Sequence, residues 1–247
     1  MPEPGSEEPV QMTKTGRKQV APEETTSSPV RRYRRVIFQV MLFSALGIFA
    51  LLTALVKTTP SFPIDLQITR AVQSIDSSYF AGFMKLISWP GFFPQAMIIT
   101  LIIALRLYIF GLHWESVVAL LAAFISGATN TLVKNWIQRP RPSLEAVDVF
   151  AMLDSYSFPS AHVMLYTILF GFVWYLIYTL LRASLTRIFL LGLFGVFILF
   201  VGISRIYLGQ HWASDVLGAY LLGGLLLVGV ILFYQWGKTR FFTNKRN

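Results

Sequence analysis

Long apolar runs recur along this chain, and they restrict its fold more than any other feature of the sequence. A helix needs about 20 consecutive apolar residues to cross the hydrocarbon core of a bilayer. Six runs approach or reach that length, namely residues 36–56, 92–110, 117–133, 163–181, 188–203 and 216–233. The 247 residues are 55% hydrophobic and only 13% charged, which is unusual for a soluble domain. We therefore predict an all-α polytopic membrane protein with six transmembrane helices.

The segments outside these runs complete the predicted organisation. Residues 1–30 are rich in Pro, Glu, Ser and Thr, and this composition favours a disordered cytoplasmic N-terminal tail. Residues 57–90 carry apolar residues at helical spacing, interrupted by prolines. This pattern predicts a short amphipathic helical segment at the outer interface, between the first and second spans. We expect the membrane domain to occupy residues 31–237 and a basic cytoplasmic tail to occupy residues 238–247.

Positive charge near the ends of the runs predicts the orientation. Four arginines within residues 31–35 precede the first run, and Lys and Arg are enriched on the cytoplasmic side of membranes. Six spans then leave both termini in the cytoplasm and put the segments after the third and fifth runs on the outer face, periplasmic or extracellular. The segment after the third run nevertheless carries Lys134, Arg139 and Arg141. Because excess Lys and Arg are disfavoured on that face, we expect cations there to serve a function.

Composition argues against several classes of function. The formal net charge of +9 would suit nucleic acid, but the cations are not gathered on one soluble domain, so we expect no nucleic-acid partner. The chain has no cysteine, which excludes disulfides, zinc–thiolate sites and cysteine nucleophiles. The acidic residues Glu145, Asp148 and Asp154 lack compact metal-ligand spacing.

The stretch from Ser204 to Asp215 combines an arginine, a histidine and an aspartate between two apolar runs. His211 and Asp215 are four residues apart, so a helix that began near His211 would place both side chains on one face. The carboxylate could then hold one imidazole nitrogen and leave the other free to attack or to accept a proton. The alternative is that both residues only cap a transmembrane helix, and this stretch alone does not decide between the two.

Two further polar segments are predicted to lie on the same face, one after the third run and one before the fourth. Ser160 could cap the fourth helix, whose free N–H groups would favour an anion. The cationic and imidazole residues of the three segments are Lys134, Arg141, His162, Arg205 and His211. Three cations suit a phosphate dianion, while one histidine could attack phosphorus and the other could protonate a departing alcohol.

Together the three segments resemble the signature motifs of the type 2 phosphatidic acid phosphatase family, which comprises lipid phosphate phosphatases. The first motif, K-x6-R-P, is matched by Lys134, Arg141 and Pro142. The second motif, P-S-G-H, is matched by Pro159, Ser160 and His162, with Ala161 in place of the glycine. The third motif, S-R-x5-H-x3-D, is matched by Ser204, Arg205, His211 and Asp215. The resemblance covers roughly residues 36–237.

This resemblance implies a metal-independent hydrolase that needs no cofactor and forms a phosphohistidine. His211 would attack phosphorus, Asp215 would orient His211, and His162 would protonate the leaving lipid hydroxyl. The phosphoryl oxygens would be bound by Lys134, Arg141, Ser160, the backbone amide of Ala161 and Arg205. The implied partners are the bilayer and a lipid phosphate or diphosphate, such as phosphatidic acid, phosphatidylglycerol phosphate or undecaprenyl diphosphate. The alternatives are a lipid phosphotransferase with the same site and a catalytically silent scaffold that binds phospholipid.

Some residues near the motifs receive simpler interpretations. Arg139 lies outside the first motif, and we expect it to contact a headgroup or to belong to a loop. The nearby aromatic residues Trp136, Tyr156, Tyr207 and Trp212 are interpreted as interface aromatics. Alanine at position 161 keeps its backbone N–H, so it replaces glycine without strain unless the local φ is positive.

Overall fold

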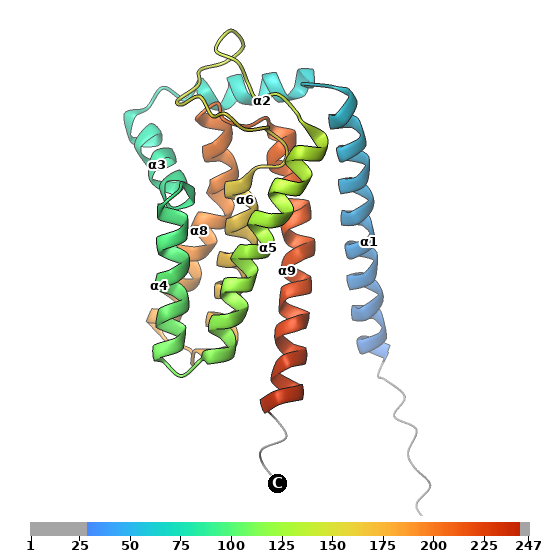
Figure 1. The fold of residues 1–247 in the computed structure, drawn as a ribbon, viewed down its shortest axis with the longest axis vertical. Coiled ribbons are helices and arrows are strands. Elements are labelled where there is room, and N and C mark those ends of the chain that lie inside the picture. Colours follow the sequence, from blue (N-terminus) through green and yellow to red (C-terminus); the bar gives the residue numbers. More distant parts are fainter. Residues whose placement is uncertain (1–28, 243–247) are drawn as a thin grey trace, which may run out of the picture. The chain divides into compact units, whose positions relative to one another are not determined.

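The structure is a computed structural model, and it describes residues 29–242 (Figure 1). Within that range the chain is helical and contains no strand. Its elements are α1 (Pro29–Thr58), α2 (Pro63–Gln73), α3 (Ser78–Ser88), η1 (Trp89–Gly91), α4 (Gln95–Ile109), α5 (His113–Ile137), α6 (Ala161–Leu165), η2 (Tyr166–Phe170), α7 (Gly171–Leu180), α8 (Leu185–Tyr207) and α9 (Ala213–Phe242). The predicted N-terminal tail, apart from its last two residues, lies outside the described residues, as do residues 243–247.

Five helices are long and apolar enough to cross a membrane: α1, α5, the continuous helix formed by α6, η2 and α7, α8, and α9. With 15 residues, α4 is too short to span alone, but it passes the same test together with α3 and η1. The axes of that pair are bent by 65° at the break between residues 91 and 95. The predicted fold class is therefore confirmed, with α2 as the short amphipathic helix between the first two spans. The segment 78–91, predicted as interfacial, directly precedes α4 in this bent pair, which is called the bent second span below.

The helices extend beyond the apolar runs at the ends that carry polar residues. Thus α5 continues to Ile137, α8 to Tyr207 and α9 to Phe242. Lys134 and Arg205 consequently lie on helices, and the first five residues of the predicted C-terminal tail are helical.

The chain divides at residue 39, within α1, into two units, and the core and site described below lie in the second. The centre of that unit is the helix formed by α6, η2 and α7, which contacts α5, α8 and α9 (Figure 1). In the most apolar 18-residue stretch of this helix 67% of the residues are buried, against 6–33% in the corresponding stretches of the other four helices. His162, at the start of this central helix, therefore lies centrally at one end of the helix bundle.

The longest connection between described helices, residues 138–160, lies at the same end as α2 (Figure 1). Two contacts fix its middle: the Gln73 side chain donates to the backbone oxygen of Asp148 (2.7 Å), and the Phe150 N–H donates to the oxygen of Leu208 (3.0 Å). The loop also packs on Gly209, which has a φ of 64° and where a Cβ atom would lie 1.9 Å from the Asp148 oxygen. Only glycine satisfies both constraints at this position.

Candidate active site

His211 lies in the short connection between α8 and α9, and the start of α9 fixes its partner. Helix α9 begins at Ala213, two residues after His211, so His211 precedes the helix that carries Asp215. The Asp215 carboxylate accepts a hydrogen bond from the Trp212 N–H at 2.8 Å, as an acidic residue in a first helical turn often does. Its Oδ2 atom also lies 3.5 Å from Nδ1 of His211 and accepts from the Ser157 hydroxyl. The predicted pairing of imidazole and carboxylate is therefore present.

The other imidazole nitrogen of His211 faces a cation. Nη1 of Arg141 lies 3.3 Å from Nε2 of His211 and donates to the Gln210 backbone oxygen at 2.5 Å. The remaining nitrogens of Arg141 donate to Ser155, through Nε to its backbone oxygen (2.6 Å) and through Nη2 to its hydroxyl (2.9 Å). The guanidinium is thus anchored beside the imidazole by Ser155 of its own loop and by the Gln210 backbone oxygen.

These neighbours settle the tautomer and charge of His211. Arginine only donates and an ionised carboxylate only accepts, so the hydrogen lies on Nδ1 and the lone pair on Nε2. Burial lowers the pKa of His211 well below its ordinary value, and the charges of Arg141, Lys134 and Arg205 lower it further. The hydrogen bond at Ser157 acts in the opposite direction. At neutral pH the imidazole is therefore uncharged, and the lone pair on its Nε2 lies among cations.

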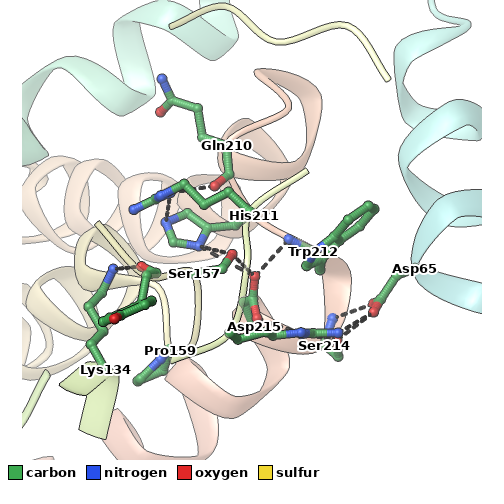
Figure 2. A network of polar contacts seen from close by, with 12 residues as sticks. Asp65, Lys134, Ser157, Pro159, Gln210, His211, Trp212, Ser214 and Asp215 are labelled. Carbon is green, nitrogen blue, oxygen red and sulfur yellow. Dashed lines mark hydrogen bonds and ion pairs between the residues drawn. The ribbon is translucent and has the colours of Figure 1, made fainter. Parts of the chain in front are cut away.

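Lys134 reaches the same region from the last turn of α5. Its ammonium donates to the Tyr156 backbone oxygen, and its side chain is largely buried (Figure 2). One turn earlier, Asn130 donates to the Pro159 backbone oxygen at 2.9 Å and so ties the second motif to α5. A pocket of about 560 Å³ opens beside the ammonium; it is lined by Thr131, Lys134, Asn135, Asp154, Ser155 and Tyr156.

Ser160, His162 and Arg205 share one property: each is buried and carries side-chain polar atoms without a hydrogen-bond partner. These atoms are the Ser160 hydroxyl oxygen, Nε2 of His162, and Nε and Nη2 of Arg205. They make up four of the six such atoms within residues 29–242. Ser160 occupies the N-cap position of α6, but its side chain does not cap the helix as predicted. Because buried polar groups are nearly always paired, such a group of atoms indicates a place for an anionic ligand.

The break in the second span contributes residues that the sequence reading missed. The Ser88 hydroxyl accepts from Nη1 of Arg205 at 2.6 Å. The ring of Phe92 lies 4.7 Å from the imidazole of His162 and 5.1 Å from the guanidinium carbon of Arg205, centroid distances that permit ring and cation–π contacts. Gly91 lies against His162 so closely that a Cβ atom would be 2.3 Å from its Cδ2. The sequence W-P-G-F-F-P signals a break, but nothing in it signals that the break lies at a site.

A family model described as the PAP2 superfamily matches residues 115–240, which include all three motifs. The chain belongs to this family. Phosphatidylglycerophosphatase B of Bacillus subtilis is 30% identical over 182 residues, covering 72% of this chain and 87% of that protein. A PAP2-type phosphatidylglycerolphosphate phosphatase from Bacillus subtilis has a similar crystal structure, with a TM-score of 0.70 and 29% identity, covering 81% of this chain and 98% of that one. Aquifex aeolicus LpxE shares the fold, with a TM-score of 0.57 and 18% identity, covering 70% of this chain and 97% of that one.

Membership of the PAP2 family confirms the resemblance seen in the motifs. The protein is a multi-pass membrane protein and a lipid phosphate hydrolase. The residues matched by the PAP2 model begin at position 115, so the contacts from Ser88, Gly91 and Phe92 come from outside the matched region.

The structure changes the interpretation of two residues near the PAP2 motifs. Arg139 does belong to a loop, as predicted, but it is 1% exposed and forms ion pairs with Asp65 and Asp215, so it is not a headgroup contact. Trp212 is not an interface aromatic, since it is 6% exposed and its indole N–H donates to the Pro140 oxygen at 3.2 Å. Both residues pack the loop 138–160 onto the start of α9.

Alanine in place of the glycine of the PAP2 motif causes no backbone strain. Gln138 is the one residue other than glycine with a positive φ in the range 29–242, so Ala161 has an ordinary helical φ. Its side chain is exposed. In the same range, no three His, Asp or Glu side chains gather as metal ligands would.

We predict that Gly91→Ala lowers kcat for release of phosphate from a lipid phosphate by roughly 100-fold, because the imidazole of His162 must move and small displacements at a reacting centre cost about that much. The control is Gly82→Ala in α3, where a Cβ atom would meet nothing within 4 Å. Both purified variants should keep the unfolding temperature of the wild type to within a few degrees. Equal activity of the two variants would contradict the prediction.

Proposed function

We propose that the protein removes the terminal phosphate of a membrane lipid by forming a phosphohistidine on His211. The observation that carries this proposal is the pair of contacts on its imidazole, with Nδ1 3.5 Å from the Asp215 carboxylate and Nε2 3.3 Å from the Arg141 guanidinium. Asp215 would keep the hydrogen on Nδ1, and Arg141 would attract the phosphate to the lone pair on Nε2.

The reaction would proceed in two displacements at phosphorus. In the first, Nε2 of His211 forms a bond to phosphorus, the bond to the lipid oxygen breaks, and His162 gives its proton to that oxygen. In the second, a water molecule attacks the phosphohistidine and passes a proton to His162, and the electron pair of the P–N bond returns to Nε2. Inorganic phosphate is then released, and both histidines regain their starting states.

Binding of the phosphoryl oxygens would fall to Lys134, Arg141, Ser160, the Ala161 amide and Arg205. The unpartnered donors of Ser160 and Arg205 support this role, because an oxyanion would satisfy them. Positive charge around the phosphoryl group would also stabilise the negative charge that it carries in the transition state.

Among lipid phosphates, we propose phosphatidylglycerol phosphate as the preferred substrate. The support comes from the curated protein and the crystal structure from Bacillus subtilis, whose names specify this substrate and which this chain matches over most of their length. Phosphatidic acid and undecaprenyl diphosphate are the competing candidates. All three carry a terminal phosphate on a long apolar anchor, so discrimination must arise outside the phosphate site.

We further propose that both termini are cytoplasmic and that the site faces the outer leaflet. The motif residues lie at the C-terminal ends of α5 and α8 and at the N-terminal ends of α6 and α9, which is one end of the bundle. The opposite end of α9 carries Lys238 and Arg240, as the cytoplasmic side of a membrane protein commonly does.

The central prediction concerns His211. Purified His211→Ala should release no phosphate from phosphatidylglycerol phosphate, and wild type should trap phosphate on His211 after an acid-free quench. The matched control is His113→Ala at the start of α5, whose ring lies 4.5 Å from Tyr108. Wild type should show the highest kcat/KM for phosphatidylglycerol phosphate when the three lipids are compared. A phosphorylated acceptor in place of free phosphate would identify a phosphotransferase, and wild type without turnover would rule out the proposal.

The pH dependence should follow the lowered pKa of His211. Protonation removes the lone pair on Nε2, so kcat/KM falls as the pH drops through the pKa of the free enzyme. Since burial and the neighbouring cations lower this pKa well below 6.5, the midpoint of the acidic limb should lie below pH 6.5. Arg141→Gln removes one of those cations and should move the midpoint upward, even though its overall activity is reduced. A wild-type midpoint above pH 6.5 would contradict this prediction.

The absence of cysteine from the chain allows a direct test of orientation. Glu145→Cys places one thiol at an exposed position of the loop 138–160, and Arg182→Cys places one at an exposed position between α7 and α8. In intact cells, a membrane-impermeant maleimide should label the cysteine at 145 at once and the cysteine at 182 only after permeabilisation. The reverse order of labelling would show that the proposed orientation is wrong.

A further inference from the structure

A buried arginine outside the motifs is bound on every side by fixed polar groups. Nη1 of Arg139 lies 2.6 Å from Oδ1 of Asp215, and Nη2 lies 2.8 Å from Oδ2 of Asp65. Nη1 also donates to the Ser214 hydroxyl at 2.7 Å, and Nε donates to the Pro60 backbone oxygen at 2.9 Å. The side chains of all three charged residues are at most 1% exposed. This arrangement is too well ordered and too deeply buried for a headgroup contact.

Asp65 links this arginine to the start of α9. It lies in the first turn of α2, and its Oδ1 accepts from the Ser214 N–H at 2.8 Å. Its Oδ2 accepts from the Ser214 hydroxyl at 2.7 Å. Figure 2 shows Asp65 reaching from α2, drawn in cyan, towards Ser214 and Asp215. Asp65 therefore holds both the arginine and the residue that precedes Asp215.

The two oxygens of Asp215 have separate partners. Oδ1 pairs with Arg139, whereas Oδ2 accepts from Ser157 and from the Trp212 N–H and faces His211. Without the Arg139 contact, Oδ1 would have no partner, and only the two hydrogen bonds on Oδ2 would restrict rotation of the carboxylate about its terminal bond. The imidazole of His211 would then be oriented less well even though every group that contacts phosphate was in place.

We propose that Arg139, held by Asp65 on α2, is a positioning residue that fixes the Asp215 carboxylate towards His211. This inference rests on the proposed role of His211 as the nucleophile. Buried ion pairs contribute little net stability compared with apolar packing, so a positioning role accounts for this network better than a stabilising one. The proposal also gives α2 a part in the chemistry, although α2 contains no motif residue and precedes the matched region.

The test compares Asp65→Asn with Asp76→Asn, since the second variant makes the same chemical change at an exposed aspartate that forms no ion pair with any residue in the range 29–242. Rapid-quench single turnovers of the full-length proteins with phosphatidylglycerol phosphate give two numbers. The amount of phosphohistidine formed per protein, the amplitude, gives the fraction of protein with a folded site. The rate constant of its formation reports the attack by His211 on phosphorus. For Asp65→Asn we expect the rate constant to fall about 10- to 100-fold, with unchanged amplitude and with KM and inhibition by inorganic phosphate within about threefold of wild type.

Arg139→Lys provides a second, independent variant that keeps the buried positive charge. One ammonium cannot replace the planar fork that reaches Asp65, Ser214 and Asp215 together, so its rate constant should also fall. If Asp65 acts through Arg139, the double variant should be no slower than the slower single variant. Should either single variant fail to fold, the other carries the test.

Three results would overturn the inference. The first is a rate constant for Asp65→Asn equal to that of Asp76→Asn, and the second is an Asp65→Asn variant that loses phosphohistidine amplitude but keeps the wild-type rate constant. The third is a double variant of Asp65→Asn and Arg139→Lys whose rate constant falls by the product of the two single effects. Each assumes that wild type forms the phosphohistidine. If wild type formed none, the proposed function would fail first, and the inference would fall with it.

Discussion

The buried charge of Asp215 is the constraint on which the rest of the site depends. A carboxylate without water is costly unless its oxygens are paired, and here the direct partners come from two segments while a third segment holds one of those partners. The loop 138–160 supplies Arg139 and Ser157, the residue before α9 supplies the Trp212 N–H, and Asp65 on α2 binds the arginine. The same contacts that pair the buried carboxylate therefore join the loop, the start of α9 and α2 at the end of the bundle where His211 lies.

The region before the matched family segment supports three of the groups that the proposed reaction uses, namely Asp215, Arg205 and His162. Asp65 supports Asp215 through Arg139, Ser88 binds Arg205, and Gly91 with Phe92 bounds the imidazole of His162. All motif residues lie within 115–240, yet none of these supports does. The bent second span and α2 thus position side chains that α5, α6, α8 and α9 carry. This division explains how the motifs can be short and widely spaced while the geometry that they need is tightly determined.

The sequence predicted the parts of this structure that depend on local composition. Apolar runs predicted the spans, and motif spacing predicted which side chains of the three segments meet. Helix ends were placed too early, because Lys134 and Arg205 interrupt the apolar runs although the backbone stays helical through both. The ion pairs of Arg139 were not predicted because its partner Asp65 is 74 residues away, and no local pattern marks the pair. Gly91 and Ser88 were missed for the same reason, since their importance comes only from what the fold places beside them.

The cations at the site are an exception to the tendency of Lys and Arg to stay on the cytoplasmic side, and their contacts explain what holds them in place. This tendency depends on the Lys and Arg residues of short loops and not on net charge, so the acidic residues of the same loop do not remove the exception. Arg139 forms ion pairs with two carboxylates, and Arg141 donates to the backbone oxygens of Ser155 and Gln210. Each arginine is therefore fixed by partners of its own at the face that the proposed orientation places outside, which is where cations are expected only if they serve a function.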